Sequence, residues 1–197
     1  MGIDLDPRMI DVARRTYPAP TFRCMNVLDV GALSGPFDFV FCIGNVAPHS
    51  TQDEFARFVG DVANILRPGG GVDLPGRQLG LRLDERRLPV SAPAAGSGDA
   101  VFLREYREVS ESRVRFVTRL VAGERTVFEG DVWLYPLRTA AYLQLHEEQG
   151  FDLLDHVADF QGLVAATTSD TGSVFVFRSR RGTDGLTPGA RKGRGCA

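Results

Sequence analysis

Residues 1–15, MGIDLDPRMIDVARR, contain the start of a helix that directly follows a short apolar stretch. Asp6 can accept hydrogen bonds from the free amides of a first helical turn, and Pro7 suits the first helical position because its missing N–H would have no partner there. The helix then has one apolar face, made by Met9, Ile10 and Ala13. An apolar residue and Asp4 before such a start are typical of a strand end inside an α/β domain.

The next segments continue this pattern. TFRCMNVLDV (21–30) predicts a short strand that runs into a turn, and FDFVFCIG (37–44) predicts a strand buried on both faces of a parallel sheet. Residues 50–70 contain the clearest helix signal, which is a Thr51–Glu54 capping box, apolar residues at helical spacing and a Pro-Gly-Gly stop at 68–70. This order predicts a doubly wound, mostly parallel sheet that binds ligands at the carboxyl ends of its strands.

The second half of the chain has a different pattern. Segments 101–109, 113–121 and 125–135 alternate apolar and charged residues, with a turn at Gly123 and Glu124, and they predict a three-stranded antiparallel meander with one face in water. Residues 137–149 predict a helix closed by Gly150. FDLLDHVADF (151–160) and GSVFVFR (172–178) predict a final antiparallel pair of strands.

Composition excludes several classes of protein. The 197 residues are 43% hydrophobic with a net charge of −2, which argues against nucleic acid or a membrane surface as the main partner. No apolar run has the length of a membrane span. The three cysteines lack metal-ligand spacing and indicate a reducing, cytoplasmic location. We expect the basic, glycine-rich segment 181–197 to be a disordered tail; a nucleic-acid-binding tail is the alternative.

In this order, GIDLDPRMIDVAR, FDFVFCIGNVAPH and ILRPGG resemble the class I S-adenosylmethionine-dependent methyltransferases. The strings CIGN…H and FLREYRE…VFEGDVWLYPL are most similar to the small-molecule branch that includes glycine N-methyltransferase. The resemblance covers roughly Gly2 to Arg178. It implies a Rossmann-like catalytic domain over 1–180 with an inserted meander at about 100–135. The implied activity is methyl transfer from S-adenosylmethionine to a small-molecule acceptor, with an amine as one candidate class.

The resemblance also implies residues for the adenosine half of the cofactor. Asp4 would accept hydrogen bonds from both ribose hydroxyls, and the alternative is that it caps the following helix, for which Asp6 is better placed. Leu5 and Met9 would flank the adenine, with plain core positions as the alternative. Asn26, where the family often has Asp, would bind the adenine amino group through its side-chain oxygen, and the backbone of Val27 would meet the adenine ring edge.

The remaining implied residues follow the strand at 37–41. Cys42, Ile43 and Gly44 would line the methionine arm of the cofactor. Asn45 lies where this branch positions the reacting group of the substrate, and His49 lies at the mouth of the site, with an ordinary surface histidine as the alternative. No metal site and no catalytic triad are expected, because the sulfonium methyl is already activated and the protein mainly aligns the reactants.

The sequence departs from the family in two places. The family's first strand and glycine-rich turn have no counterpart before Gly2, so we expect an N-terminally truncated chain with weak cofactor binding or none. After residue 71, Pro75, Gly76 and Gly80 predict a poor central strand. Two other functions stay open, namely a catalytically inactive remnant or binding module of the same fold, and a nicotinamide-dependent oxidoreductase, which also places an acid near ribose.

Overall fold

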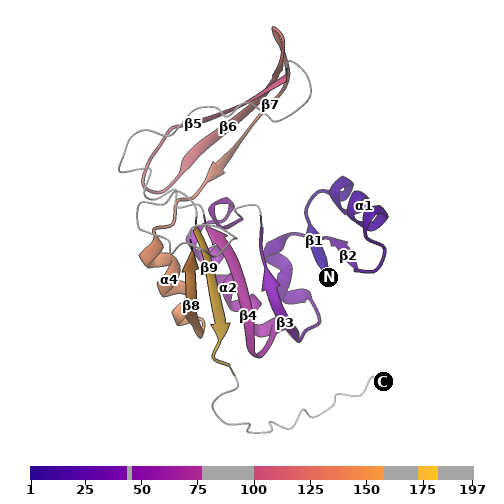
Figure 1. Cartoon of the computed structure of the whole chain (residues 1–197). Helices are drawn as coiled ribbons and strands as arrows, with labels where there is room; N and C mark the ends of the chain where they lie inside the picture. Colours follow the sequence, from indigo (N-terminus) through magenta and orange to yellow (C-terminus); the bar gives the residue numbers. More distant parts are fainter. Residues whose placement is uncertain (44–45, 77–99, 158–172, 182–197) are drawn as a thin grey trace, which may run out of the picture.

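The computed structural model describes residues 1–43, 46–76, 100–157 and 173–181, and its elements are labelled in Figure 1. The strands are β1 Gly2–Asp4, β2 Phe22–Cys24, β3 Phe37–Phe41, β4 Leu66–Gly76, β5 Ala100–Arg107, β6 Val114–Ala122, β7 Arg125–Leu134, β8 Phe151–Val157 and β9 Ser173–Ser179. The helices are α1 Pro7–Thr16, α2 Gln52–Ile65 and α4 Thr139–Glu148, with short 3-10 helices η1 Val27–Ala32 and η2 Ala47–His49. Of the segment 181–197, which we predicted to be a disordered tail, residues 182–197 lie outside the described residues.

The strands form three sheets. A four-stranded sheet has the order β3-β4-β9-β8, a two-stranded sheet pairs β1 with β2, and a three-stranded sheet has the order β5-β6-β7. The pairs β1–β2 and β3–β4 are parallel, whereas β9 is antiparallel to both of its neighbours. The structure therefore confirms the predicted Rossmann-like α/β class with an antiparallel meander. Among the described strands, the parallel pairing is confined to the first half of the chain.

Helix α1 begins as its sequence predicts. The Asp6 side chain accepts a hydrogen bond from the Arg8 backbone N–H at 2.8 Å, and Pro7 occupies the first turn. The Arg8 guanidinium also pairs with the Asp6 carboxylate at 2.8 Å, which lowers the pKa of Asp6. Ile10 is buried, and the helix contacts β1 and β2.

Helix α2 carries the complete capping box. The Glu54 N–H donates to Thr51 Oγ1 at 3.3 Å, and the Thr51 N–H donates to Glu54 Oε2 at 2.9 Å. The helix ends at Ile65, earlier than the Pro-Gly-Gly stop, because the chain becomes extended from Leu66. Its buried face consists of Phe55, Phe58, Val59, Val62, Ala63 and Ile65.

An aromatic cluster joins α4 to the sheet. His146 is fully buried and stacks on Phe177 of β9 with ring centroids 4.1 Å apart. Its Nδ1 donates to the Tyr142 carbonyl at 2.8 Å, since a carbonyl oxygen can only accept. Tyr142 in turn packs on Phe175 and on Phe55 of α2 at centroid distances of 4.7 and 5.4 Å. Helices α2 and α4 therefore cover the same face of the four-stranded sheet.

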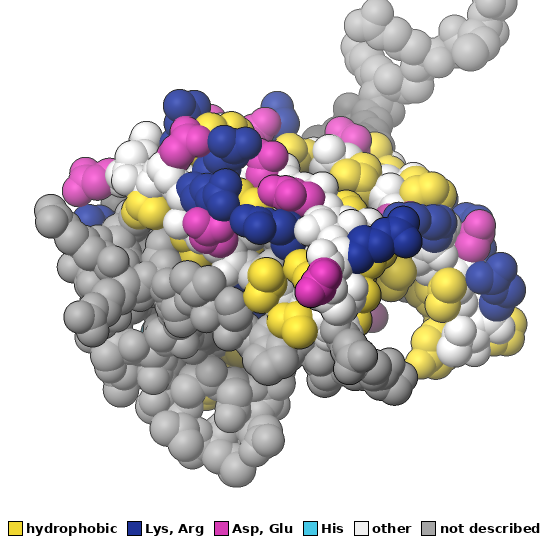
Figure 2. Space-filling model, turned by 90° about the horizontal axis from the view of Figure 1, so that it is seen from above, with side chains coloured by type: hydrophobic (Ala, Val, Ile, Leu, Met, Phe, Trp, Pro, Cys, Tyr) yellow, Lys and Arg dark blue, Asp and Glu magenta, His cyan; other side chains and the backbone are white. Residues whose placement is uncertain are grey.

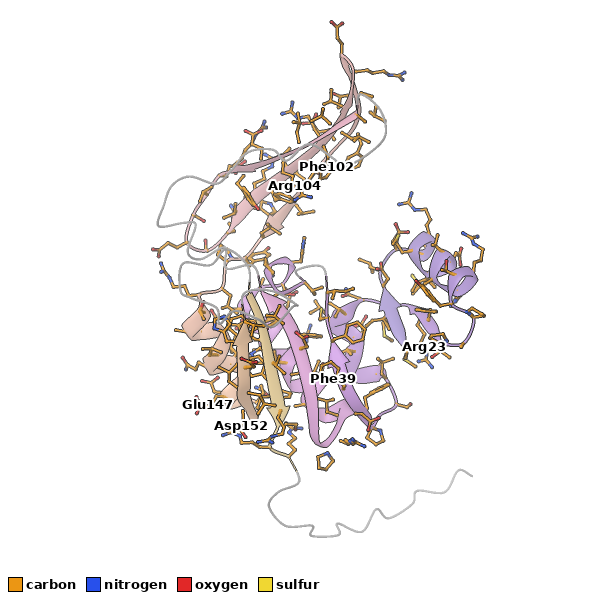
Figure 3. The ribbon with its side chains drawn as sticks, in the orientation of Figure 1. Arg23, Phe39, Phe102, Arg104, Glu147 and Asp152 are labelled. Atoms are coloured by element: carbon orange, nitrogen blue, oxygen red, sulfur yellow. The ribbon has the colours of Figure 1, made fainter. Side chains whose placement is uncertain are left out.

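The meander projects from the four-stranded sheet as a twisted ribbon (Figure 1). Gly123 has φ 58° and forms the turn between β6 and β7, as predicted. Arg115 pairs with Asp131 and with Glu108, both at 2.9 Å, and the side of the molecule in Figure 2 accordingly shows acidic and basic side chains interspersed. Phe102 and Arg104 extend from β5 (Figure 3), with the Arg104 guanidinium 5.2 Å from the Phe102 ring centroid.

The strand at 37–41 differs from its prediction. We expected burial on both faces, but Phe39 is 48% exposed and Phe41 is 66% exposed, whereas Phe37 and Val40 pack against the core. The apolar run is therefore covered on one face only by the described residues. Phe39 is labelled on the ribbon in Figure 3.

The expectation that the segment after residue 71 makes a poor central strand was wrong. This segment of β4 contains glycines and Pro75, yet the strand pairs with β3 on one side and with β9 on the other through Gly76. Val72 at its centre is fully buried. No helix of the described residues is long and apolar enough to cross a membrane.

The capping box provides a test of the fold. Replacing Thr51 by alanine removes the hydroxyl that accepts from the Glu54 N–H, and it should lower the free energy of unfolding by about 1 kcal/mol. Thr51→Ser keeps the hydroxyl and is the matched control, expected to lie within a few tenths of a kcal/mol of the parent. Urea unfolding followed by circular dichroism measures both. Equal losses in the two variants would contradict the role of the hydroxyl.

His146 provides a test of pH dependence. Burial lowers the pKa of His146 from its ordinary value of 6.5 to about 4, so the unfolded chain binds this proton more readily than the folded one. The contribution of neutral His146 to the free energy of unfolding is therefore fully present above pH 6.5. This contribution, about 3 kcal/mol, is lost as the pH falls through 4. Urea unfolding at pH 7 and pH 4.5 should show a smaller loss for His146→Phe than for the parent. An equal loss would contradict this assignment.

Candidate functional site

Hydrogen bonds connect the carboxyl ends of β1 and β2. The Met25 N–H donates to the Asp4 carbonyl at 2.9 Å, and the Cys24 thiol donates to the Leu5 carbonyl at 3.4 Å. The turn after β1 and the turn after β2 are therefore neighbours. Asp4, Leu5, Asn26 and Val27, four of the residues predicted to contact adenosine, lie on these two turns.

Asp4 and Asp6 have separate roles in the structure. Asp6 caps α1, whereas Asp4 Oδ1 accepts a hydrogen bond from the Asp6 N–H at 2.8 Å. Asp4 is exposed, and the described residues place no hydrogen-bond donor on its second oxygen. The helix is thus capped without Asp4, and one Asp4 oxygen is available to a ligand.

Three apolar side chains that follow β1 or β3 in the sequence are exposed. Leu5 is 68% exposed, Met9 is 55% exposed and Ile43, just after β3, is 64% exposed. The alternative that Leu5 and Met9 are core residues does not fit these values. Because exposed apolar surface gains free energy when a ligand covers it, these side chains suit the flat apolar part of a ligand.

Asn26 already has a structural task. Its side-chain oxygen accepts from the Leu28 N–H at 3.0 Å and thereby caps η1. An amide oxygen has a second lone pair, so this hydrogen bond leaves room for one more donor. The Val27 side chain is half-buried and packs against the core. A ligand could therefore contact the main chain of Val27 but not its side chain.

Cys42 follows β3 and is half-buried. Burial, together with the nearby charge of Asp73, raises the pKa of the Cys42 thiol to about 11. The Cys42 N–H donates to the Asp73 carbonyl at 2.9 Å, which extends the β3–β4 pairing by one residue. Cys42 is therefore a neutral thiol at physiological pH.

His49 lies on a different element from the adenosine residues. It is exposed at the end of η2, and partial desolvation lowers its pKa below the ordinary value. In the described part of the chain, no hydrogen bond or ion pair connects it to Asp4 or Cys42. Gly44 and Asn45, which were predicted to lie between Cys42 and His49, are outside the described residues.

Sequence reasoning missed Asp73. This residue lies toward the carboxyl end of β4, and its Oδ1 is buried without a hydrogen-bond partner among the described residues. Burial raises the pKa of its carboxyl. The available signal was an acid directly after the apolar Val72 near a strand end, but the following proline and glycine argued against a strand.

Comparison with known proteins gives a consistent picture. Residues 1–70 match the family described as a methyltransferase domain, and no curated protein matches the chain. A structure of an S-adenosylmethionine-dependent methyltransferase from Clostridium acetobutylicum is similar at 14% identity and a TM-score of 0.75, over 90% of this chain and 73% of that one.

Two sugar-related enzymes have the same fold. S-adenosylmethionine-bound CalS10, an amino pentose methyltransferase from Micromonospora echinaspora, has 19% identity and a TM-score of 0.69, over 90% of this chain and 72% of that one. The sugar N-methyltransferase KedS8 from a Streptoalloteichus species has 22% identity and a TM-score of 0.67, over 91% and 70%. The chain therefore has the Rossmann-like fold of S-adenosylmethionine-dependent methyltransferases, and its first 70 residues match the methyltransferase domain.

Proposed function

We propose that this chain is an S-adenosylmethionine-dependent methyltransferase that acts on a small molecule with an amino group. The observation that carries the proposal is Asp4. Asp4 is the last residue of β1 and lies inside the segment that matches the methyltransferase domain. Because Asp6 caps α1, Asp4 is not needed as the helix cap. One of its carboxylate oxygens accepts from the Asp6 N–H, and its main-chain carbonyl accepts from the Met25 N–H just after β2. A carboxylate in that position suits the paired hydroxyls of a ribose.

The other strand-end residues suit the remaining parts of the cofactor. Leu5 and Met9 offer exposed apolar surface to the adenine, while Asn26 and the main chain of Val27 offer polar groups at its edge. Cys42, Ile43 and Gly44 are assigned to the methionine arm. When bound, the cofactor supplies a methyl group that its sulfonium has already activated.

The neutral state of Cys42 has a chemical consequence in this site. A thiolate is the nucleophilic form of cysteine, and a thiol whose pKa is about 11 holds roughly one part in a thousand of thiolate at pH 8. Cys42 can therefore lie beside an activated methyl group without competing with the acceptor. Burial of the thiol thus protects the enzyme from methylating itself.

An amine acceptor is supported by the kind of relatives that share the fold. CalS10 is described as an amino pentose methyltransferase and KedS8 as a sugar N-methyltransferase. Asn45 stays assigned to the reacting group of the acceptor, and His49 to the mouth of the site. The second candidate is a catalytically inactive binding module, which would bind the cofactor without turnover. The nicotinamide-dependent alternative lacks support, because residues 1–70 match a methyltransferase domain.

Calorimetry with S-adenosylhomocysteine tests the proposal. The family's first strand and glycine-rich turn have no counterpart before Gly2, which led us to expect weak binding or none. The residues proposed here for the adenosine half are nevertheless all present, so the proposal requires that the parent chain bind this product measurably. Asp4→Ala should weaken that binding about 10–100-fold, as expected for lost hydrogen bonds to a carboxylate. Asp11→Ala is the matched control, because Asp11 is an exposed acid on α1 with an ion pair to Arg14 at 3.8 Å. The control should bind as the parent does. No binding by the parent, or equal weakening in both variants, would contradict the assignment.

A further inference from the structure

Strand β4 carries a carboxylate whose partner is not among the described residues. Asp73 is half-buried, and its Oδ1 is buried without a hydrogen-bond donor. The ion pairs of the described residues leave Asp73 out, although nine other carboxylates of this part of the chain are paired with arginines. Removing a carboxylate oxygen from water without giving it a hydrogen-bond donor costs free energy. The site therefore favours binding of a donor or a cation.

The groups near Asp73 do not meet this need. Cys42 and Tyr142 are close enough for the Asp73 charge to contribute to raising the pKa of the thiol and of the phenol. For both groups burial is the larger cause. Neither group donates a hydrogen bond to Oδ1. Neither neighbour therefore satisfies the unpaired oxygen.

The position of Asp73 connects it to the proposed reaction. Phe41 of β3 and Asp73 are register partners in the parallel pair, so their side chains lie on the same face of the sheet. The next residue, Cys42, donates its N–H to the Asp73 carbonyl. Cys42 and Ile43 are the residues assigned to the methionine arm, which carries the transferable methyl. A donor held by Asp73 would thus lie at the reacting end of the cofactor.

We propose that the Asp73 carboxylate binds the amino group of the acceptor and receives its proton during methyl transfer, an inference that rests on the proposed function. An acceptor that binds protonated first gives this proton to water, which frees the nitrogen lone pair. The lone pair forms the new N–C bond as the S–C bond breaks, and the electron pair of that bond stays on sulfur. The methylated nitrogen then carries one proton too many, which passes to the Asp73 carboxylate. The carboxyl returns this proton to water when the product leaves.

This role predicts a preference for amines over alcohols. An amino group brings several N–H donors and, when protonated, a positive charge, whereas a hydroxyl brings one donor and no charge. Charge-assisted hydrogen bonds are about twice as strong as neutral ones. Asp73 is therefore a residue that determines acceptor specificity.

The test compares glucosamine with glucose, which differ by one amino group in place of a hydroxyl. Binding is followed in the chain saturated with S-adenosylhomocysteine, through the backbone NMR signals of Phe41, Cys42 and Asp73. The parent should bind glucosamine at least tenfold more tightly than glucose. Asp73→Asn should bind the two sugars equally. Asp38→Asn is the matched control: it removes one exposed carboxylate of β3, ion-paired with Arg67, and should keep the preference.

The outcomes separate the two proposals. Equal responses of the parent to both sugars, including no response to either, would overturn the role of Asp73, as would a preference retained in Asp73→Asn. This comparison in the parent does not depend on the folding of any variant. Loss of S-adenosylhomocysteine binding in the parent would instead contradict the proposed function. Asp73→Glu keeps the charge and should retain part of the preference.

Discussion

The double pairing of β4 is the constraint on which the four-stranded sheet depends. One edge of β4 pairs in parallel with β3, and the other edge pairs antiparallel with β9, which in turn pairs with β8; residues 71–73 are paired on both edges. Val72, fully buried between these partners, faces the core built by α2 and α4. The same strand positions Asp73 beside the residues that follow β3. The architecture and the proposed chemistry thus share one element.

Features set by neighbouring residues could be predicted from the sequence. Helix α2 follows from Thr51, Glu54 and a regular apolar face, and the meander follows from alternation and a glycine that accepts φ 58°. Strand β4 could not be predicted in this way. Pro75 and the glycines weaken a strand locally, but pairing with β3 and β9, which are distant in the sequence, supplies hydrogen bonds on both sides.

In the candidate site too, features set by neighbouring residues could be predicted, and features set by distant segments could not. The separate tasks of Asp4 and Asp6 follow from their places relative to the helix start, and the hydrogen bonds agree with that division. The burial of one Asp73 oxygen depends on how distant segments pack and leaves no mark in a sequence. The exposure of Phe39 and Phe41 is similar, because an apolar run does not tell how many of its faces will be covered.

Ion pairs and aromatic contacts form within the meander. Arg115 pairs with Glu108 and Asp131 inside it, and Tyr106 packs on Phe116 with centroids 5.1 Å apart. It contacts the sheet region at the Tyr135 N–H, which donates to the Pro48 carbonyl at 2.7 Å, and Glu111 between β5 and β6 pairs with Arg138 before α4 at 3.8 Å. A main-chain hydrogen bond survives most changes of side chain at either end. Substitution of the Tyr135 side chain therefore leaves this link between the meander and the sheet region intact.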